Sequence, residues 1–584
     1  MSENEPAKWA VGLADAFTYQ TDVATTKKEL ELQEKRATKA EESLSRIQHS
    51  AWWRLSVPMR RVRSRLRAKS STQGKTTPIA ISAASPVEVA EKRAGALASR
   101  LTTVLNEFAN GQRADQPQDL AGSLESVAHL LDSRPADKPL AWLAYIAVMA
   151  KYPRGEDMLR FHTEVQASGA PTALAQLLAQ NSKRPDSWAQ TADLELIRDV
   201  VVDPTSTSHR DFHTGIQRVV RESVPRWAKK GAVRLIIWGE RYVYHLPSPL
   251  ETWRIMEYVP RVKPKLAEEF PETIPVPWET VVIVPEPTSQ QGRAEALACL
   301  GEWSGNELCA IFYDTIMYTL PETLMDKSRI GLTNFIPTIR TSKRVSTISH
   351  AVGDDLRNFV GSFGNIGLPV PDVAAHPLPM VAEQLSDADY TANLPRLQGV
   401  PGLPVVLSVG SLEPRKNQIM TLRAAERLWQ EGHQFQLVFI GWGSWRADDI
   451  IAEIERAQSR GRPVRIVRRA DEELLWTAYR SAKFSIYISI AEGYGLPIAE
   501  SIAAGTPAIT SDYGSMSEVA ANGGVVTVNP RSIDSVSDAM RSLLSDADLL
   551  AKLNAQAADL PETSWEDYAN QTWSWLVEGN RPNG

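Results

Sequence analysis

Cysteine and long apolar runs are scarce in this sequence. Two cysteines, Cys299 and Cys309, cannot stabilise a chain of 584 residues through disulfides, and they lack the CxxC spacing of a metal or redox site. The longest apolar stretch, near residues 140–150, is shorter than the ~20 residues that cross a bilayer, so it predicts a buried helix. The sequence also lacks clustered His or Cys ligands and a P-loop. These absences argue against a disulfide-stapled domain, a membrane-spanning helix, a zinc site and a Walker-type nucleotide site.

The composition is that of a globular protein, with 43% hydrophobic and 23% charged residues. The length predicts about three or four folded units. A net charge of −6 argues against a general nucleic-acid binder. The charge is unevenly distributed, because residues 51–75 contain eight basic side chains and no acidic one. This basic segment needs an explanation of its own.

Residues 21–50 are rich in Glu, Lys, Gln and Ala and contain no Gly or Pro. Apolar residues recur there every seven positions, at Val23, Leu30, Ala37 and Leu44. This spacing predicts a short coiled coil and hence a homo-oligomer. The second seam position is poorly filled, so a lone solvated helix stays open as the alternative.

The basic segment reads AWWRLSVPMRRVRSRLR and interleaves Trp and aliphatic residues with Arg. Trp rings favour the headgroup level of a bilayer, and guanidinium groups meet anionic lipid there. We therefore predict contact with an anionic membrane surface through Trp52, Trp53, Arg54, Arg60, Arg61 and Arg63. A nucleic-acid patch and a solvated or protein-facing basic helix are the alternatives.

The hydrophobic pattern of the remaining residues differs from one region to the next. Residues 88–192 show helical periodicity without a strand pattern, whereas short buried runs such as TVVIVPE and PVVLSVG alternate with amphipathic helical runs further on. Such alternation predicts parallel sheets built from βαβ units. We expect a tail with a coiled coil (1–50), a basic segment and linker (51–87), a helical domain (88–192) and two Rossmann-like domains facing a cleft (193–395 and 396–584). The last helix is expected to cross back to the first Rossmann-like domain.

The stretch SVGSLEPRKNQ, residues 408–418, follows a predicted strand and precedes a predicted helix. Gly410 permits a tight turn there. Arg415 and Lys416 lie at the loop–helix junction, where backbone N–H groups already favour an anion. A fixed pair of cations at this place suits a diphosphate. Taken alone, the pair could equally be two solvated side chains.

The stretch AEGYGLPIAES, residues 491–501, follows the predicted strand FSIYIS. Glu492 precedes a helix and Glu500 lies within it, so both carboxylates can face a cleft. Gly493 and Gly495 allow a ligand to approach the backbone closely. The arrangement can hold sugar hydroxyls and phosphate oxygens together, although a capped helix with solvated Glu residues gives the same spacing.

Taken together, these stretches resemble the donor-binding half of family 4 (group 1) retaining glycosyltransferases, which have the GT-B fold. The family's E-x7-E pattern is matched by Glu492 and Glu500. Its Gly-x4-Arg-Lys loop is matched by Gly410, Arg415 and Lys416. The stretches HTGIQRVVRES (213–223), FYDTIMYTLPE (312–322) and STISHAVGDDL (346–356) resemble the first half of a bacterial surface-polysaccharide branch. Many relatives have His where this chain has Tyr313.

The resemblance implies roles for particular residues. Its catalytic residues would be Glu492, Arg415, Lys416 and Asp314. Its donor-binding residues would be Gly215, Gly410, Tyr313, Ser349, Gly493, Tyr494, Gly495, Leu496 and Glu500. The co-substrate would be a nucleotide-diphosphate sugar, with no cofactor and no metal, because cations and helix termini offset the charge of the leaving diphosphate.

The function implied is transfer of a sugar, mannose or rhamnose, to a growing lipid-linked bacterial surface glycan with retention of configuration. The N-terminus lacks a basic region followed by an apolar run, so no secretory signal is expected. We therefore expect a cytoplasmic protein at the inner face of the bacterial cytoplasmic membrane. The alternatives are a GT-B nucleotide-sugar epimerase and a catalytically inactive membrane-bound scaffold.

Overall fold

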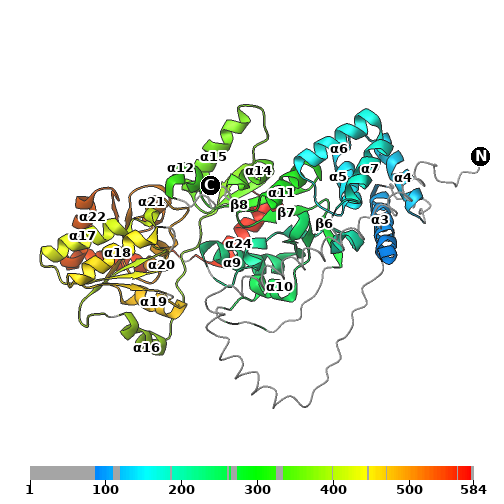
Figure 1. Cartoon of the computed structure of the whole chain (residues 1–584). Helices are drawn as coiled ribbons and strands as arrows, with labels where there is room; N and C mark the ends of the chain where they lie inside the picture. Colours follow the sequence, from blue (N-terminus) through cyan, green and yellow to red (C-terminus); the bar gives the residue numbers. More distant parts are fainter. Residues whose placement is uncertain are drawn as a thin grey trace, which may run out of the picture. The chain divides into compact units, whose positions relative to one another are not determined.

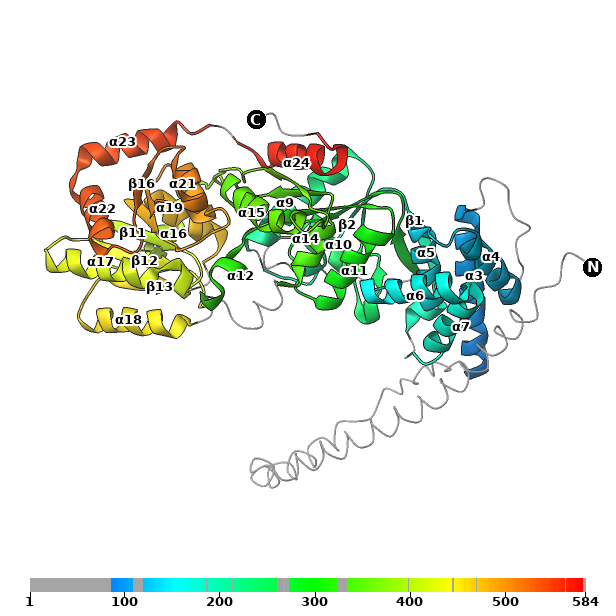
Figure 2. The same ribbon diagram turned by 90° about the horizontal axis from the view of Figure 1, so that it is seen from above.

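The computed structural model describes residues 86–108, 119–184, 187–259, 272–323, 333–443, 446–561 and 563–580 (Figures 1 and 2). Within these ranges residues 213, 398 and 469 are not described, and outside them residues 262 and 264 are. The predicted coiled coil and the six predicted membrane-contact residues, Trp52 to Arg63, lie outside the described residues. The chain divides into two compact units. One comprises Met1–Glu195 with Pro271–Ile274, and the other Leu196–Phe270 with Pro275–Gly584.

The first unit is helical. It contains α3 (Pro86–Phe108), α4 (Leu120–Ser133), α5 (Lys138–Met149), α6 (Gly155–Ser168), α7 (Ala170–Asn181) and the 3-10 turn η1 (Trp188–Thr191). Helix α5 is apolar all round and is buried from Leu140 to Met149, as a helix inside a bundle should be. The side chain of Asp137 caps its start by accepting a hydrogen bond from the backbone N–H of Leu140 at 3.0 Å. Arg100 ties α3 to this core by donating to the carbonyl of Ala147 at 2.7 Å.

The second unit begins with a Rossmann-like half, called here the first half. Its described strands form a six-stranded parallel sheet in the order β10-β9-β8-β7-β2-β3. These strands are β2 (Val200–Val202), β3 (Val233–Leu235), β7 (Val281–Val284), β8 (Glu307–Phe312), β9 (Arg344–Thr347) and β10 (Asp372–Ala375). The main helices are α9 (Gly215–Lys230), α10 (Pro249–Met256), α11 (Gln291–Trp303), α14 (Phe335–Thr341) and α15 (His350–Gly364). The runs VVV and VVIV form strands because branched side chains pack well between two helical layers.

Shorter elements complete the region before β11. They are β1 (Asp193–Ile197), α8 (Thr205–Ser208), β4 (Ile237–Trp238), η2 (Glu240–Tyr242), β5 (Tyr244–His245), β6 (Thr273–Pro277), α12 (Ile316–Thr319), η3 (Pro321–Thr323) and α16 (Asp387–Leu397). Among the described residues, no helix combines the length and the apolar character needed to cross a bilayer.

The second half is another Rossmann-like body. Its described strands also form a six-stranded parallel sheet, in the order β13-β12-β11-β14-β15-β16. They are β11 (Val405–Val409), β12 (Gln436–Ile440), β13 (Val464–Val467), β14 (Phe484–Tyr487), β15 (Ala508–Ser511) and β16 (Val525–Val528). The helices are α17 (Gln418–Gln430), α18 (Ala447–Ser459), α19 (Glu472–Ser481), α20 (Leu496–Ala503), α21 (Gly514–Ala520), α22 (Ile533–Ser545) and α23 (Ala547–Ala558). Apolar clusters fill both faces of this sheet. The two parallel six-stranded sheets confirm the predicted α/β fold with two Rossmann-like domains, as in GT-B.

The last helix, α24 (Trp565–Trp573), continues into a π-helical turn, η5 (Ser574–Glu578), and lies against α9 of the first half (Figures 1 and 2). The indole N–H of Trp227 on α9 donates to the carbonyl of Ala569 at 3.0 Å. The indole of Trp575 donates to the carbonyl of Val345 at 3.2 Å, which attaches the turn to β9. The chain therefore passes between the two halves twice.

Candidate active site

The loop after β11 is shaped by glycine. Gly410 has φ of 143°, a backbone conformation that side chains with a Cβ rarely adopt. A Cβ added to Gly441, which follows the neighbouring strand β12, would lie 1.9 Å from the carbonyl oxygen of Gly410. The two loops therefore meet backbone to backbone. This packing directs the following 3-10 turn, η4 (Pro414–Lys416), and its two cations toward the end of β14.

Glu492 is the centre of a charged cluster at the ends of β11 and β14. Its Oε1 lies 2.8 Å from a guanidinium nitrogen of Arg415 and 2.6 Å from Nζ of Lys416. The hydroxyl of Tyr487 donates to the same oxygen at 2.7 Å. Arg415 also contacts Glu413 at 2.8 Å. The structure thus brings together the three residues that the sequence predicts to be catalytic in this half.

The cluster sets the charge state of its members. Burial alone would raise the pKa of Glu492, but the positive charges of Lys416 and Arg415 lower it to about 2. Burial lowers the pKa of Lys416 although Glu492 lies against it. Burial also acts to lower the pKa of Arg415, yet Glu492 and Glu413 raise it above its ordinary value. Glu492 is therefore ionised at neutral pH. The Arg415 and Lys416 side chains that pair with it can also interact with a bound anion.

Asp314 reaches the same cluster from the first half. It follows β8, and its carboxylate accepts a hydrogen bond from the N–H of Ile316 at 3.0 Å. Burial raises its pKa, and the charges of Arg415 and Glu492 act on it as well. The structure therefore places Asp314 within electrostatic range of the cations, as a site shared by both halves requires.

Gly493 is pressed against the first half. A Cβ at this position would lie 2.0 Å from the carbonyl oxygen of Tyr313, so only glycine fits. The hydroxyl of Ser349 donates to the carbonyl of Gly493 at 2.7 Å. The hydroxyl of Tyr313 points the other way and donates to the carbonyl of Pro285 at 2.7 Å. Tyr313 thus meets the glycine loop with its backbone, whereas its phenol is buried in the first half.

The start of α20 also contacts the first half. Gly495 has φ of 106° and immediately precedes this helix. A Cβ added to Gly215, at the start of α9, would lie 3.0 Å from the Leu496 side chain. The hydroxyl of Tyr494 donates to the carbonyl of Leu378, in the segment that connects the halves. The predicted residues Gly215 and Leu496 are therefore neighbours, while the Tyr494 hydroxyl is turned toward the connection.

Glu500 is held apart from Glu492. One of its carboxylate oxygens pairs with Arg218 of α9 at 2.8 Å. The other accepts a hydrogen bond from the hydroxyl of Tyr479 at 2.9 Å. Sequence reasoning missed Arg218 and Tyr479 as members of the site. Arg218 could have been found, because it lies three residues after Gly215 and hence on the same face of α9.

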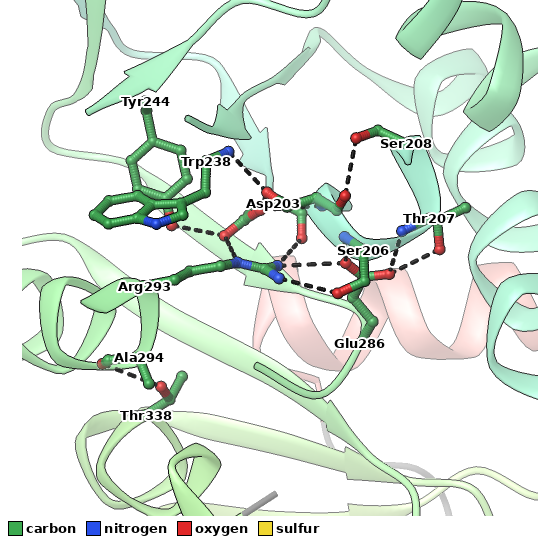
Figure 3. Close-up of polar contacts among 11 residues, drawn as sticks. Asp203, Ser206, Thr207, Ser208, Trp238, Tyr244, Glu286, Arg293, Ala294 and Thr338 are labelled. Atoms are coloured by element: carbon green, nitrogen blue, oxygen red, sulfur yellow. Dashed lines mark hydrogen bonds and ion pairs between the residues drawn. The ribbon is translucent and has the colours of Figure 1, made fainter. Parts of the chain in front are cut away.

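The end of the first sheet carries a buried polar cluster that sequence reasoning also missed (Figure 3). Asp203 follows β2, Glu286 follows β7, and the fully buried guanidinium of Arg293 lies between them at 2.8 and 3.4 Å (Figure 3). Glu286 accepts the backbone N–H and the hydroxyl of Thr207 at 2.9 and 2.7 Å. Burial raises the pKa of Glu286, and Arg293 opposes that rise. The cluster therefore holds α8 against the ends of β2 and β7.

Residues 394–559 match the sequence family described as Glycosyl transferases group 1. The candidate residues of the second half, from Gly410 to Glu500, all fall within the matched residues. The predicted group 1 resemblance is thereby confirmed. The candidates of the first half, Gly215 to Ser349, lie outside the matched range.

The chain is similar to two curated proteins of Escherichia coli. Serotype-specific mannosyltransferase WbdA is 24% identical over 344 residues, which cover 55% of this chain and 40% of WbdA. O-antigen chain mannosyltransferase B is 30% identical over 168 residues, which cover 28% of this chain and 44% of that relative. The chain thus matches less than half the length of either relative. Among solved structures, sucrose-phosphate synthase from Thermosynechococcus elongatus is 16% identical with a TM-score of 0.45, over 64% of this chain and 97% of that one.

Proposed function

We propose that this chain is a retaining glycosyltransferase that moves mannose or rhamnose from a nucleotide-diphosphate sugar to a growing lipid-linked bacterial surface glycan. The convergence of Arg415, Lys416 and Glu492 at the ends of β11 and β14, inside the group 1 match, carries the proposal. Ligands of open parallel sheets bind at this edge. The two mannosyltransferase relatives support mannose as the first donor sugar to test.

The proposed chemistry uses charges that are already in place. Arg415 and Lys416 would stabilise the negative charge that grows on the leaving diphosphate, an electrostatic effect that commonly contributes most to catalysis. Glu492 and the backbone N–H groups of the glycine loop would orient the donor sugar, and Glu500 would bind the ribose hydroxyls. The acceptor would attack from the same face as the leaving group, with the donor phosphate as base. The two cations would supply the positive charge that a metal ion supplies elsewhere.

The donor is identified by a panel of GDP-, UDP- and dTDP-linked sugars scored by thermal unfolding of the full chain. A ligand that binds only the native state at 100 times its Kd stabilises it by about 2.7 kcal/mol. We expect one base-and-sugar class, led by GDP-mannose, to raise Tm by several degrees. The matching nucleoside monophosphates, which lack the second phosphate, should raise it much less. If no nucleotide sugar shifts Tm, or the monophosphates shift it equally, the donor proposal is wrong.

We further propose that residues 51–75 attach the enzyme to the cytoplasmic membrane surface. Each basic residue near an anionic leaflet contributes about 1 kcal/mol to binding. Removal of residues 1–75 should therefore abolish sedimentation with anionic liposomes, whereas removal of residues 1–50 should leave it intact. A full chain with Arg54, Arg60, Arg61 and Arg63 changed to Ala should bind at least about tenfold more weakly. Undiminished liposome binding after removal of residues 1–75 would show that residues 51–75 are not the membrane-binding segment.

A further inference from the structure

The ion pair between Arg218 and Glu500 joins the two halves. Arg218 lies on α9 of the first half and Glu500 on α20 of the second, 2.8 Å apart. Their side chains are 17% and 13% exposed, so water screens the pair only weakly. The starts of the two helices touch through Gly215 and Leu496. The guanidinium of Arg218 also lies 5.7 Å from the ring centre of Trp565, which begins α24.

Glu500 is held from two sides and still has capacity for a ligand. Arg218 binds Oε1 and the hydroxyl of Tyr479 binds Oε2. A carboxylate oxygen accepts about two hydrogen bonds, so each oxygen can accept one more. Two neighbouring acceptors in one plane fit two hydroxyls on adjacent carbons. The protein therefore presents Glu500 in a fixed orientation that suits a vicinal diol, the pattern of a ribose ring.

Arg218 also governs the charge of Glu500. Burial raises the pKa of Glu500, and Arg218 opposes that rise. Glu383, in the segment that connects the halves, acts in the same direction as burial. Glu472 of α19 lies within electrostatic range of Arg218, of Glu383 and of Glu222 on α9. Arg218 is thus a cation in acidic surroundings, and its loss would leave Glu500 buried with the like charge of Glu383 unopposed.

We propose that Arg218 is a positioning residue for donor binding, because its charged hydrogen bond holds the Glu500 carboxylate in one orientation and makes donor binding depend on contact between the halves. This role rests on the proposed function, since it takes Glu500 as the ligand of the donor ribose. Arg218 acts through Glu500 and touches no reacting atom.

The test is calorimetric binding of GDP-mannose and dTDP-rhamnose to full-length Arg218→Gln, Arg218→Lys and wild-type chains. Loss of a charged hydrogen-bond partner predicts a Kd that is about 10-fold or more weaker for the Gln variant, with partial rescue by Lys. The matched control is Arg226→Gln on the same helix, because Arg226 pairs with Glu222 at 2.7 Å instead of Glu500. The control should bind like the wild type.

The pH dependence of binding separates this role from a merely structural one. Without Arg218 the pKa of Glu500 rises further, so protonation on acidification begins at a higher pH than in the wild type. The Kd of the Gln variant should therefore weaken as pH falls, over a range where the wild-type Kd is still constant. Glu500→Gln, which has no proton to gain there, should bind weakly at every pH. Similar melting temperatures for all variants would show that each is folded.

The outcomes distinguish the two proposals. If the wild type binds a nucleotide sugar and Arg218→Gln binds it equally well with the same pH profile, the role of Arg218 is wrong and the proposed function stands. Tighter binding by Arg218→Gln would mean that Arg218 competes with the donor, which also overturns the role. If the wild type binds no nucleotide sugar at any pH, the proposed function fails and the role of Arg218 fails with it.

Discussion

Replacing Arg415 and Lys416 together by alanine should lower sugar transfer at saturating donor by at least about 100-fold. Removal of a single preorganised group that stabilises developing negative charge costs about 100- to 1,000-fold in turnover. Here both cations beside Glu492 would be lost at once. The same change leaves Glu492 buried without its positive neighbours, so its pKa rises from about 2 and the carboxylate loses its orientation. The measurement is the rate of nucleoside diphosphate release in the presence of acceptor.

A control variant distinguishes this effect from a general loss of charge. Arg427 lies on α17, the helix that follows the turn with Arg415 and Lys416, and pairs with the exposed carboxylate of Asp534. Arg427→Ala should retain turnover within about threefold, because Arg427 is exposed and pairs with Asp534 and Glu431 instead of with Glu492. If the double variant keeps turnover within about tenfold of the wild type, roughly 1.4 kcal/mol, the cations do not stabilise the leaving group.

Replacing Glu492 by glutamine should lower turnover by about 100-fold with a fold that stays intact. Glutamine keeps the size of the side chain and can still accept from Tyr487, but it removes the negative charge that Arg415 and Lys416 face. The two cations then repel each other without a counter-charge, and the sugar loses a strong hydrogen-bond acceptor. Stopped assays at saturating donor give the change in turnover, and thermal unfolding reports on the fold.

Glu426→Gln is the matched control for this variant. Glu426 is also a carboxylate of the second half, but it lies on α17 and pairs with Arg462 at 2.8 Å and with Arg460 at 3.2 Å. It should leave turnover unchanged within about threefold. A Glu492→Gln chain that turns over donor within about tenfold of the wild type would show that Glu492 has no part in the reaction.

The second half was predictable in detail because its chemistry is local. Arg415 and Lys416 follow β11, and Glu492 follows β14, which pairs with β11 in parallel register. The carboxyl ends of parallel strands meet at one edge, so strand order brings these side chains together. The two sheets were also predictable from the alternation of short apolar runs with helical runs, because strands covered on both faces consist of continuous apolar residues.

Contacts between distant segments were beyond prediction from the sequence. Arg218 and Glu500 are separated by 282 positions, and their pairing depends on how the two halves meet. The orientation of the Tyr313 phenol depends on a carbonyl at Pro285 that no pattern marks. Asp203, Glu286 and Arg293 are ordinary charged residues in the sequence, and only the burial of the sheet end makes them partners.

Sugar transfer through the Glu492 cluster is tested most directly with GDP-mannose labelled in the sugar, incubated with bacterial lipid-linked glycan and the full-length chain. The wild type should place the label in the glycan and release an equal amount of GDP, only when acceptor is present. The Glu492→Gln chain should do so about 100-fold more slowly. Label that moves to another nucleotide sugar without acceptor, or equal transfer by both chains, would contradict a glycosyltransferase that works through Glu492.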